Sequence, residues 1–187
     1  MGHIRKLRFA GILGLGLLAT AGTGVAMAQG GLSANLALSN TIFTQQVGGI
    51  DGTGFALFVD SDEMADGPVG VSRLRIDDAK ISDLCMSAPV KVPGMGDRKF
   101  QMVTEGDNTQ ADNLVIGSTE IEGTLTLVKP QIGVDTGQLG GPAGSGGIAA
   151  EKLLAKDQVI HASSIAADQL TAAGAKIIIE EANGGRC

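Results

Sequence analysis

Tryptophan and tyrosine are absent from this sequence of 187 residues, and its aromatic side chains are five phenylalanines. Hydrophobic residues still make up 43% of the chain, so we expect a core built mainly from Val, Ile, Leu, Ala and Met. Glycine is abundant, with 29 residues, which favours turns and close backbone approaches over long helices. The length allows one domain once a leader is removed.

Basic residues are scarce, and three of them begin a targeting segment. They precede a charge-free apolar stretch at 9–25, and residues 26–28 (Ala-Met-Ala) form a small-x-small cleavage site. We predict that residues 1–28 are a signal peptide; the alternative is an apolar stretch retained as a membrane anchor. Residues 29–187 would then form a single β-rich domain, secreted or extracytoplasmic, in the cell envelope.

Positive charge is rarer still in the predicted mature part. Without Arg5, Lys6 and Arg8 of the leader, 11 Lys and Arg stand against 20 Asp and Glu, a net charge of −9. Binding to nucleic acid depends on Lys and Arg that neutralise phosphates, so we expect no nucleic-acid partner, and no run of basic residues offsets the balance. Walker and Rossmann motifs are absent too, so we expect no soluble cofactor.

Two cysteines are present, Cys85 and Cys187. Export to an oxidising compartment favours a disulfide between them, which would close a long loop and hold down a chain terminus. The alternative is two free thiols. One mature histidine and two distant cysteines give no ligand pair at zinc-site spacing, so we expect no metal site.

Short β-prone runs separated by polar or glycine-rich turns follow the leader. Alternation is cleanest at 120–128, where apolar side chains fall on one face. Such strands need a partner layer, so the sequence predicts a mostly β fold: a sandwich, a closed sheet or a stacked, solenoid-like sheet. Residues 149–155 and 163–173 have some helical composition. The clearest β-prone runs are 36–43, 54–59, 69–84, 99–103, 114–128 and 176–180.

A stacked array is favoured by aliphatic pairs whose members lie five residues apart. If they mark a repeat, each unit would be a strand pair stacked on the next; the alternative is coincidence among common residue types. The spacing between successive pairs is irregular, at 34, 40 and 44 residues. The pairs are Ile42/Val47, Ile76/Ile81, Ile116/Ile121 and Ile160/Ile165.

The acidic segment 60–67 invites a calcium hypothesis, because Asp60 and Asp62 have the spacing of the first ligands in a calcium loop. The fifth and sixth positions are Met64 and Ala65, which break that pattern. We therefore favour a solvated acidic loop.

Catalysis has one candidate constellation. Residues 143–147 (Ala-Gly-Ser-Gly-Gly) are similar to a relaxed nucleophile elbow, and an esterase triad would consist of Ser145, His161 and an acid such as Asp168. The Gly- and Pro-rich residues before Ser145 do not suit the strand that an elbow requires. We therefore expect no catalytic residues and keep the triad only for an alternative function.

A series of short motifs also occurs in a distinctive order. They are Gly-Thr-Gly-Phe at 52–55, Leu84-Cys85, residues 111–116 followed by 121–123, residues 158–160 and 171–175, and the final Cys187. In this order the chain resembles an uncharacterised family of secreted actinobacterial proteins. The sequences of segments 137–147 and 175–179 differ from those usual in the family, which indicates a divergent member.

The resemblance implies an exported protein without an established activity. Some members carry an automatic cholesterol-esterase label, and many are similar to proteins encoded beside a small multi-span membrane protein. The leading prediction is a non-enzymatic structural, interaction or apolar-ligand-binding module of the cell envelope, with a membrane protein or an envelope lipid as partner. The alternative is an esterase acting on lipid or sterol esters.

Overall fold

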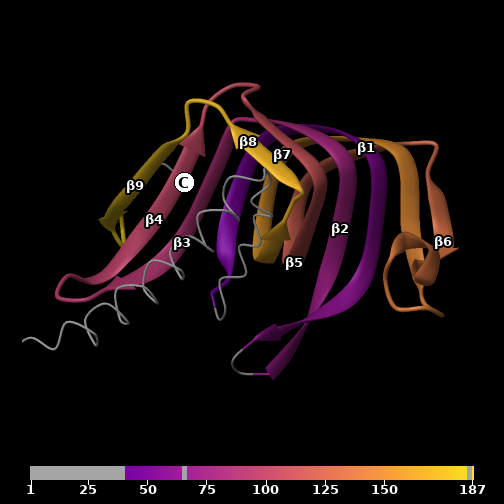
Figure 1. Ribbon diagram of the computed structural model, residues 1–187, viewed down its shortest axis with the longest axis horizontal. Helices are drawn as coiled ribbons and strands as arrows, with labels where there is room; N and C mark the ends of the chain where they lie inside the picture. The colour runs from indigo at the N-terminus through magenta and orange to yellow at the C-terminus, as the bar shows by residue number, and fades with distance from the viewer. Residues whose placement is uncertain (1–40, 65–66, 185–186) are drawn as a thin grey trace, which may run out of the picture. The chain divides into compact units, whose positions relative to one another are not determined.

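The computed structural model describes residues 41–64, 67–184 and 187. The predicted signal peptide, residues 1–28, lies outside them. The described residues form one antiparallel sheet of nine strands with a short 3₁₀ helix, which confirms the mostly β prediction (Figure 1). The elements are β1 (Phe43–Met64), β2 (Gly67–Ser82), β3 (Leu84–Val92), β4 (Gly96–Thr104), β5 (Thr109–Val128), β6 (Gln131–Asp135), η1 (Thr136–Leu139), β7 (Gly146–Ala166), β8 (Gln169–Ala172) and β9 (Lys176–Glu181).

Four long strands close the sheet on itself. β1 pairs with β2, β2 with β5, β5 with β7, and β7 pairs again with β1. The last pairing brings together residues far apart in sequence, such as Thr44 and His161. In Figure 1 these strands curve past one another side by side, with β6 paired to β7 and β8 paired to β5. We call β1, β2, β5 and β7 the ring.

The inside of the ring is filled with side chains. Leu153, Ile160 and Ile76 are almost completely buried there, as the aliphatic composition predicts, and Phe43 and Phe55 join them. The two small cavities among these core side chains measure about 20 Å³ each, close to the space of one water molecule. The interior of the ring therefore offers no room for a ligand.

Three of the four aliphatic pairs coincide with irregularities in the ring strands, whereas Ile42 of the first pair precedes β1 and is exposed. In an uninterrupted strand, residues five apart point to opposite faces. Ile76 and Ile81 are nevertheless both buried, because the alternation of buried residues shifts by one between Ile76 and Ala79. At this point Asp77 lies opposite Asn113, whose φ is +50°. The pairs within ring strands thus mark phase shifts in single strands, which keep a long curved strand facing the core.

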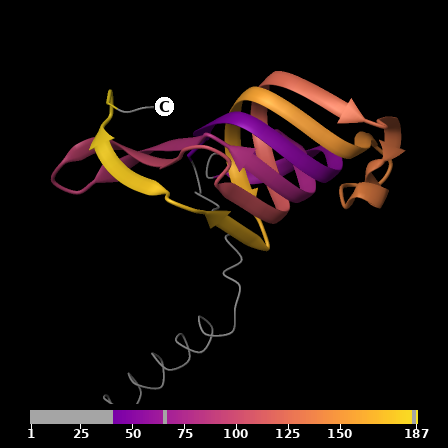
Figure 2. The same ribbon diagram turned by 90° about the horizontal axis from the view of Figure 1, so that it is seen from above.

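Three strands form an arm that leaves the ring (Figure 2). β3 joins β1 through a short pairing at 44–46 and 85–87, β4 pairs with β3, and β9 pairs with β4 at the outer edge. Cys85 of β3 and Cys187 form a disulfide with their Cα atoms 6.0 Å apart, as predicted. The bond fastens the last residue of the chain to the root of the arm.

Two local predictions are wrong. Residues 149–155 are not helical but part of β7, where pairing with β1 and β5 on both sides outweighs their weak helix propensity. The acidic segment 60–67 is not a loop along its whole length, because Asp60 and Asp62 lie in β1, paired with β2. The ambiguous stretch 163–173 continues β7 and then forms β8.

Candidate functional site

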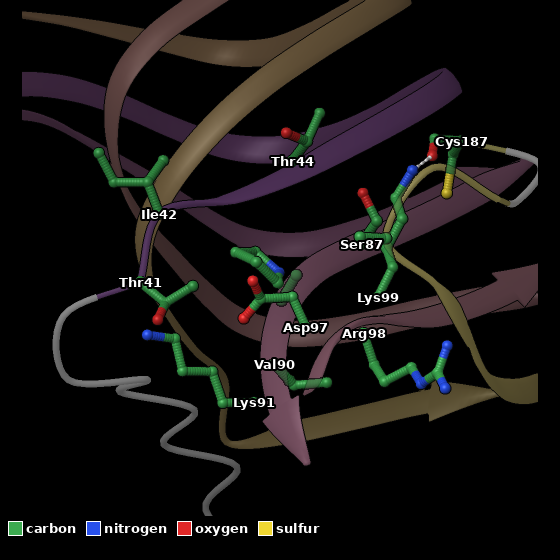
Figure 3. Close-up of a pocket in the computed structure, with 13 residues that line it drawn as sticks. Thr41, Ile42, Thr44, Ser87, Val90, Lys91, Asp97, Arg98, Lys99 and Cys187 are labelled. Atoms are coloured by element: carbon green, nitrogen blue, oxygen red, sulfur yellow. Dashed lines mark hydrogen bonds between the residues drawn. The ribbon is translucent and has the colours of Figure 1, made fainter. Parts of the chain in front are cut away.

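A groove opens where β1 separates from β3 at the root of the arm (Figure 3). The pairing of β1 with β3 ends at Thr44 and Ser87. Continued in the same register, it would set Ile42 opposite Pro89, which has no amide hydrogen to donate, so proline suits this unpaired edge. The groove measures about 770 Å³, within the usual range of small-molecule sites.

The walls of the groove combine apolar and charged side chains. Lys91 lies directly opposite Asp97 in the hairpin of β3 and β4, and Lys91 is exposed. Within the described part of the chain, Lys91 makes no ion pair, so its ammonium group is available to an anionic ligand. The apolar lining comes from Ile42, Ala88, Pro89 and Val90, and the charged lining from Lys91, Asp97, Arg98 and Lys99.

Cys187 closes one end of the groove. The Nζ of Lys99 and the Nε2 of Gln101 both donate to the main-chain oxygen of Cys187, the latter at 3.2 Å. Figure 3 shows Lys99 pointing to Cys187, with Lys91 at the other end of the groove near Thr41. The disulfide therefore shapes the site as well as fastening the chain.

Positive charge is concentrated at this groove although the protein is acidic. Lys91, Arg98 and Lys99 are three of the 11 basic residues that follow the predicted leader. Arg98 also makes a long contact of 3.7 Å with Glu181. The basic residues of this site do not form a run in the sequence, because a hairpin brings residue 91 next to residues 98 and 99. A signal did exist in the sequence: three basic residues within nine positions of an acidic chain.

The three residues of the esterase hypothesis lie apart. Ser145 precedes β7 and His161 lies sixteen residues further along the chain, about 50 Å of path at the rise of a β-strand. Among the described residues, no hydrogen bond or ion pair joins any two of the three. Ser145 Oγ lies 2.7 Å from Thr136 Oγ1, His161 Nδ1 lies 3.4 Å from Thr44 Oγ1, and Asp168 Oδ2 accepts a hydrogen bond of 2.5 Å from Asn113.

A second polar cluster fastens the hairpin of β1 and β2 to β7. Arg73 pairs with Asp62 at 2.6 Å and with Asp60 at 3.1 Å, and the hydroxyls of Ser163 and Ser164 donate to Asp62 at 2.5 and 2.8 Å. Burial would raise the pKa of Asp62, but the hydrogen bonds from both serines and from Arg73, with the charge of that arginine, lower it below its usual value. The Asp62 carboxylate is thus held ionised, and its oxygens already accept hydrogen bonds from Arg73 and the two serines.

Two further kinds of feature are absent from the described ranges. No group of three His, Cys, Asp or Glu there could hold a metal ion. No helix in residues 41–64 or 67–184 is long and apolar enough to cross a membrane.

Comparison with known families matches residues 39–187 to a family described as a family of unknown function, DUF6230. The chain belongs to this family. The match spans the ring, the arm and both cysteines, and it agrees with the resemblance to an uncharacterised family, whereas secretion and the esterase label stay predictions. No curated protein and no solved structure matches the chain.

Proposed function

We propose that the protein is a non-enzymatic module of the cell envelope that holds an anionic lipid in the groove between β1 and the arm. The observation that carries the proposal is the cluster of Lys91, Arg98 and Lys99 beside an apolar wall, in an otherwise acidic protein. Oppositely charged groups attract an anionic headgroup, and apolar lining favours an acyl chain. Both halves of an amphiphile would thus find a complementary surface.

The arrangement of charged and apolar side chains along the groove favours one orientation of such a lipid. The headgroup would meet Lys91, which has no competing ion pair in the described residues, while Lys99 is occupied by Cys187. The acyl chain would lie along Ile42 and Val90. An extracytoplasmic location is compatible with the disulfide, since such bonds persist in oxidising compartments.

The first test is binding of a fluorescent fatty acid to the mature, disulfide-bonded protein, with its neutral methyl ester for comparison. We expect the acid to bind more tightly than the ester. Lys91→Glu should weaken binding of the acid about tenfold, the equivalent of about 1.4 kcal/mol, because it replaces an attraction with a repulsion at the headgroup. Native mass spectrometry of the exported protein should also show a co-purified anionic lipid.

The matched control is Lys156→Glu, which makes the same charge change at an exposed position of β7 outside the groove. This variant should bind the acid as the parent does. An equal loss of fatty-acid affinity in both variants would show that only the net charge of the protein matters. Equal affinity for the acid and the ester would show that the charged headgroup does not contribute to binding. Either result would contradict the proposal.

A further inference from the structure

β9 is an unprotected edge of the sheet. It pairs with β4 on one side, and no other strand of the described residues pairs with its outer side. Figures 1 and 2 both place it at the end of the arm. Its sequence contains three consecutive isoleucines, and the side chains of Ile177 and Ile179 are 67% and 60% exposed. Natural proteins rarely leave such an edge uncovered, because its free backbone groups and apolar side chains recruit another strand.

The other end of the sheet shows how an edge can be blunted. β6 also carries an exposed isoleucine, Ile132, which is 81% exposed. Its pairing with β7 is interrupted by a register shift between Ile132 and Val134, at Gly133 with φ +85°. A bulge of this kind distorts an edge and discourages pairing. β9 has no such interruption in its register with β4, so its outer side remains regular.

The sequence of β9 is complementary to itself in one antiparallel register. When two identical strands pair about a twofold axis, facing residues must lie on the same side of the sheet. A register centred on Ile178 meets this condition. It places Ile177 opposite Ile179 of the second copy and Lys176 opposite Glu180 of the second copy, so two ion pairs flank an apolar centre.

Neighbouring registers are less favourable. A register centred on Ile179 would place Ile177 opposite Glu181 and Ile178 opposite Glu180 of the second copy. Isoleucines would then face glutamates, and no cross-strand ion pair would form. In residues 67–184, Lys176 and Glu180 take part in no ion pair, whereas Glu181 contacts Arg98. The two charges that the Ile178-centred register uses are therefore the two available ones.

We propose that the protein forms a symmetric dimer through antiparallel pairing of β9 with β9 of a second copy, centred on Ile178. The pairing joins two three-stranded arms into one six-stranded sheet. On one face, Phe100 of β4 lies opposite Ile179 and Met102 lies opposite Ile177, so the isoleucines of both copies extend an apolar face that already exists. The interface is short, so the dimer belongs to the weak, concentration-dependent class.

Sedimentation of the mature, disulfide-bonded protein over about a hundredfold range of concentration tests the proposal. We expect a reversible equilibrium between monomer and dimer. Ile177→Lys should abolish the dimer. The monomer should still fold, because the side chain of Ile177 is 67% exposed. The control is Ile132→Lys on β6, which makes the same change at the blunted edge and should leave the dimer intact. Circular dichroism verifies that both variants are folded.

A charge exchange tests the register. Lys176→Glu should weaken the dimer about tenfold, because two cross-strand ion pairs become repulsive. The double variant Lys176→Glu with Glu180→Lys should restore the parent affinity to within about threefold, since the exchanged charges again face each other. A dimer that survives Ile177→Lys, or a double variant that stays weak, would overturn the pairing. A protein that stays monomeric at every concentration would also overturn the proposal. Protection of the β9 amides from hydrogen exchange in such a monomer would show that β9 pairs within its own chain instead.

Discussion

The ring and the arm are built from the same kind of strand but solve the problem of burial differently. Ring strands pair on both sides over much of their length, and the side chains of Leu153 and Ile160 are buried in the interior that they enclose. The arm has one strand layer and an open edge at β9, where Ile177 and Ile179 remain exposed. A closed sheet gains stability from its core, whereas an open one keeps surfaces for contact.

The difference assigns separate tasks to the two regions. The interior of the ring is packed, with cavities of only about 20 Å³, which would suit a scaffold. The groove, the basic cluster and the uncovered edge all belong to the arm or to its root. β3 packs on the core through Leu84 and Met86, but β9 has no buried residue, so the Cys85–Cys187 bond constrains the chain where packing is weakest.

The largest effect should come from removing that bond. The two cysteines are separated by 102 residues, and in the chain-entropy model a loop of this length stabilises a fold by about 4–5 kcal/mol. Cys85→Ser should therefore melt well below the parent in chemical or thermal denaturation without reductant. Adding reductant should bring the parent to the same midpoint.

Hydrogen exchange would show whether the bond serves mainly the arm. Amides of β4 and β9 should exchange faster in Cys85→Ser, while those of β7 keep their order of protection. Uniform acceleration across both regions would mean that ring and arm unfold as one unit. A loss of stability below about 1 kcal/mol would show that the bond contributes little.

A somewhat smaller loss is expected when the core of the ring is opened. Leu153 is 0% exposed, so Leu153→Ala should lower the free energy of unfolding by about 2–5 kcal/mol through lost burial and a residual cavity. Ile177→Ala on the arm is the matched truncation, and we expect a change of less than about 0.5 kcal/mol. Urea denaturation of both variants measures the contrast. Similar losses would erase the distinction between core and edge.

The polar cluster at Asp62 should make a smaller contribution to the free energy of unfolding, and one that depends on pH. Because folding lowers the pKa of Asp62, its contribution is present above the unfolded value near pH 4 and is lost as the pH falls through the folded value. Asp62→Asn should cost about 1–3 kcal/mol at neutral pH, since charged hydrogen bonds are lost. The gap between parent and variant should shrink below about pH 4.

Urea denaturation at a series of pH values measures that gap. The control is Asp107→Asn at an exposed turn position, which should change stability by less than about 0.5 kcal/mol at neutral pH. A gap for Asp62→Asn that stays constant down to pH 2 would show that the carboxylate is not what the cluster stabilises.

Local patterns in the sequence predict the elements better than their arrangement. Runs such as 114–128 and 176–180 coincide with β5 and β9, because composition and alternation act over a few residues. Closure of the ring depends on β1 meeting β7, with Thr44 opposite His161, a separation that no local pattern encodes. The phase shifts at Asp77 and Asn113 further blur the alternation that would have revealed the strands.

The candidate site was predictable only in part. The disulfide follows from the number of cysteines and the expected compartment, with no need for the fold. The groove does not, because Ile42, Lys91 and Lys99 come together only when β1 leaves β3 and the hairpin of β3 and β4 turns back. A run of adjacent basic residues is absent, because the fold gathers the basic side chains across the β3–β4 hairpin.

The smallest effect is expected at the residues that the esterase alternative requires. Ser145 precedes β7 and His161 lies near the far end of that strand, whereas the ligand contact that we propose lies at the arm. Ser145→Ala removes the hydroxyl's contacts with Thr136 Oγ1 and with the main-chain oxygen of Pro142 and should cost about 1 kcal/mol or less, and His161→Ala at a half-buried position should cost a similar amount. Neither should alter fatty-acid binding. A catalytic serine and histidine must lie within hydrogen-bonding distance and be held to within a fraction of an ångström of the productive geometry. Ser145 and His161 share no contact and lie sixteen positions apart along an extended chain. A chromogenic ester assay on parent and variants decides the matter: hydrolysis by the parent that falls about a hundredfold or more in both variants would restore the triad and move the active region from the arm to the ring.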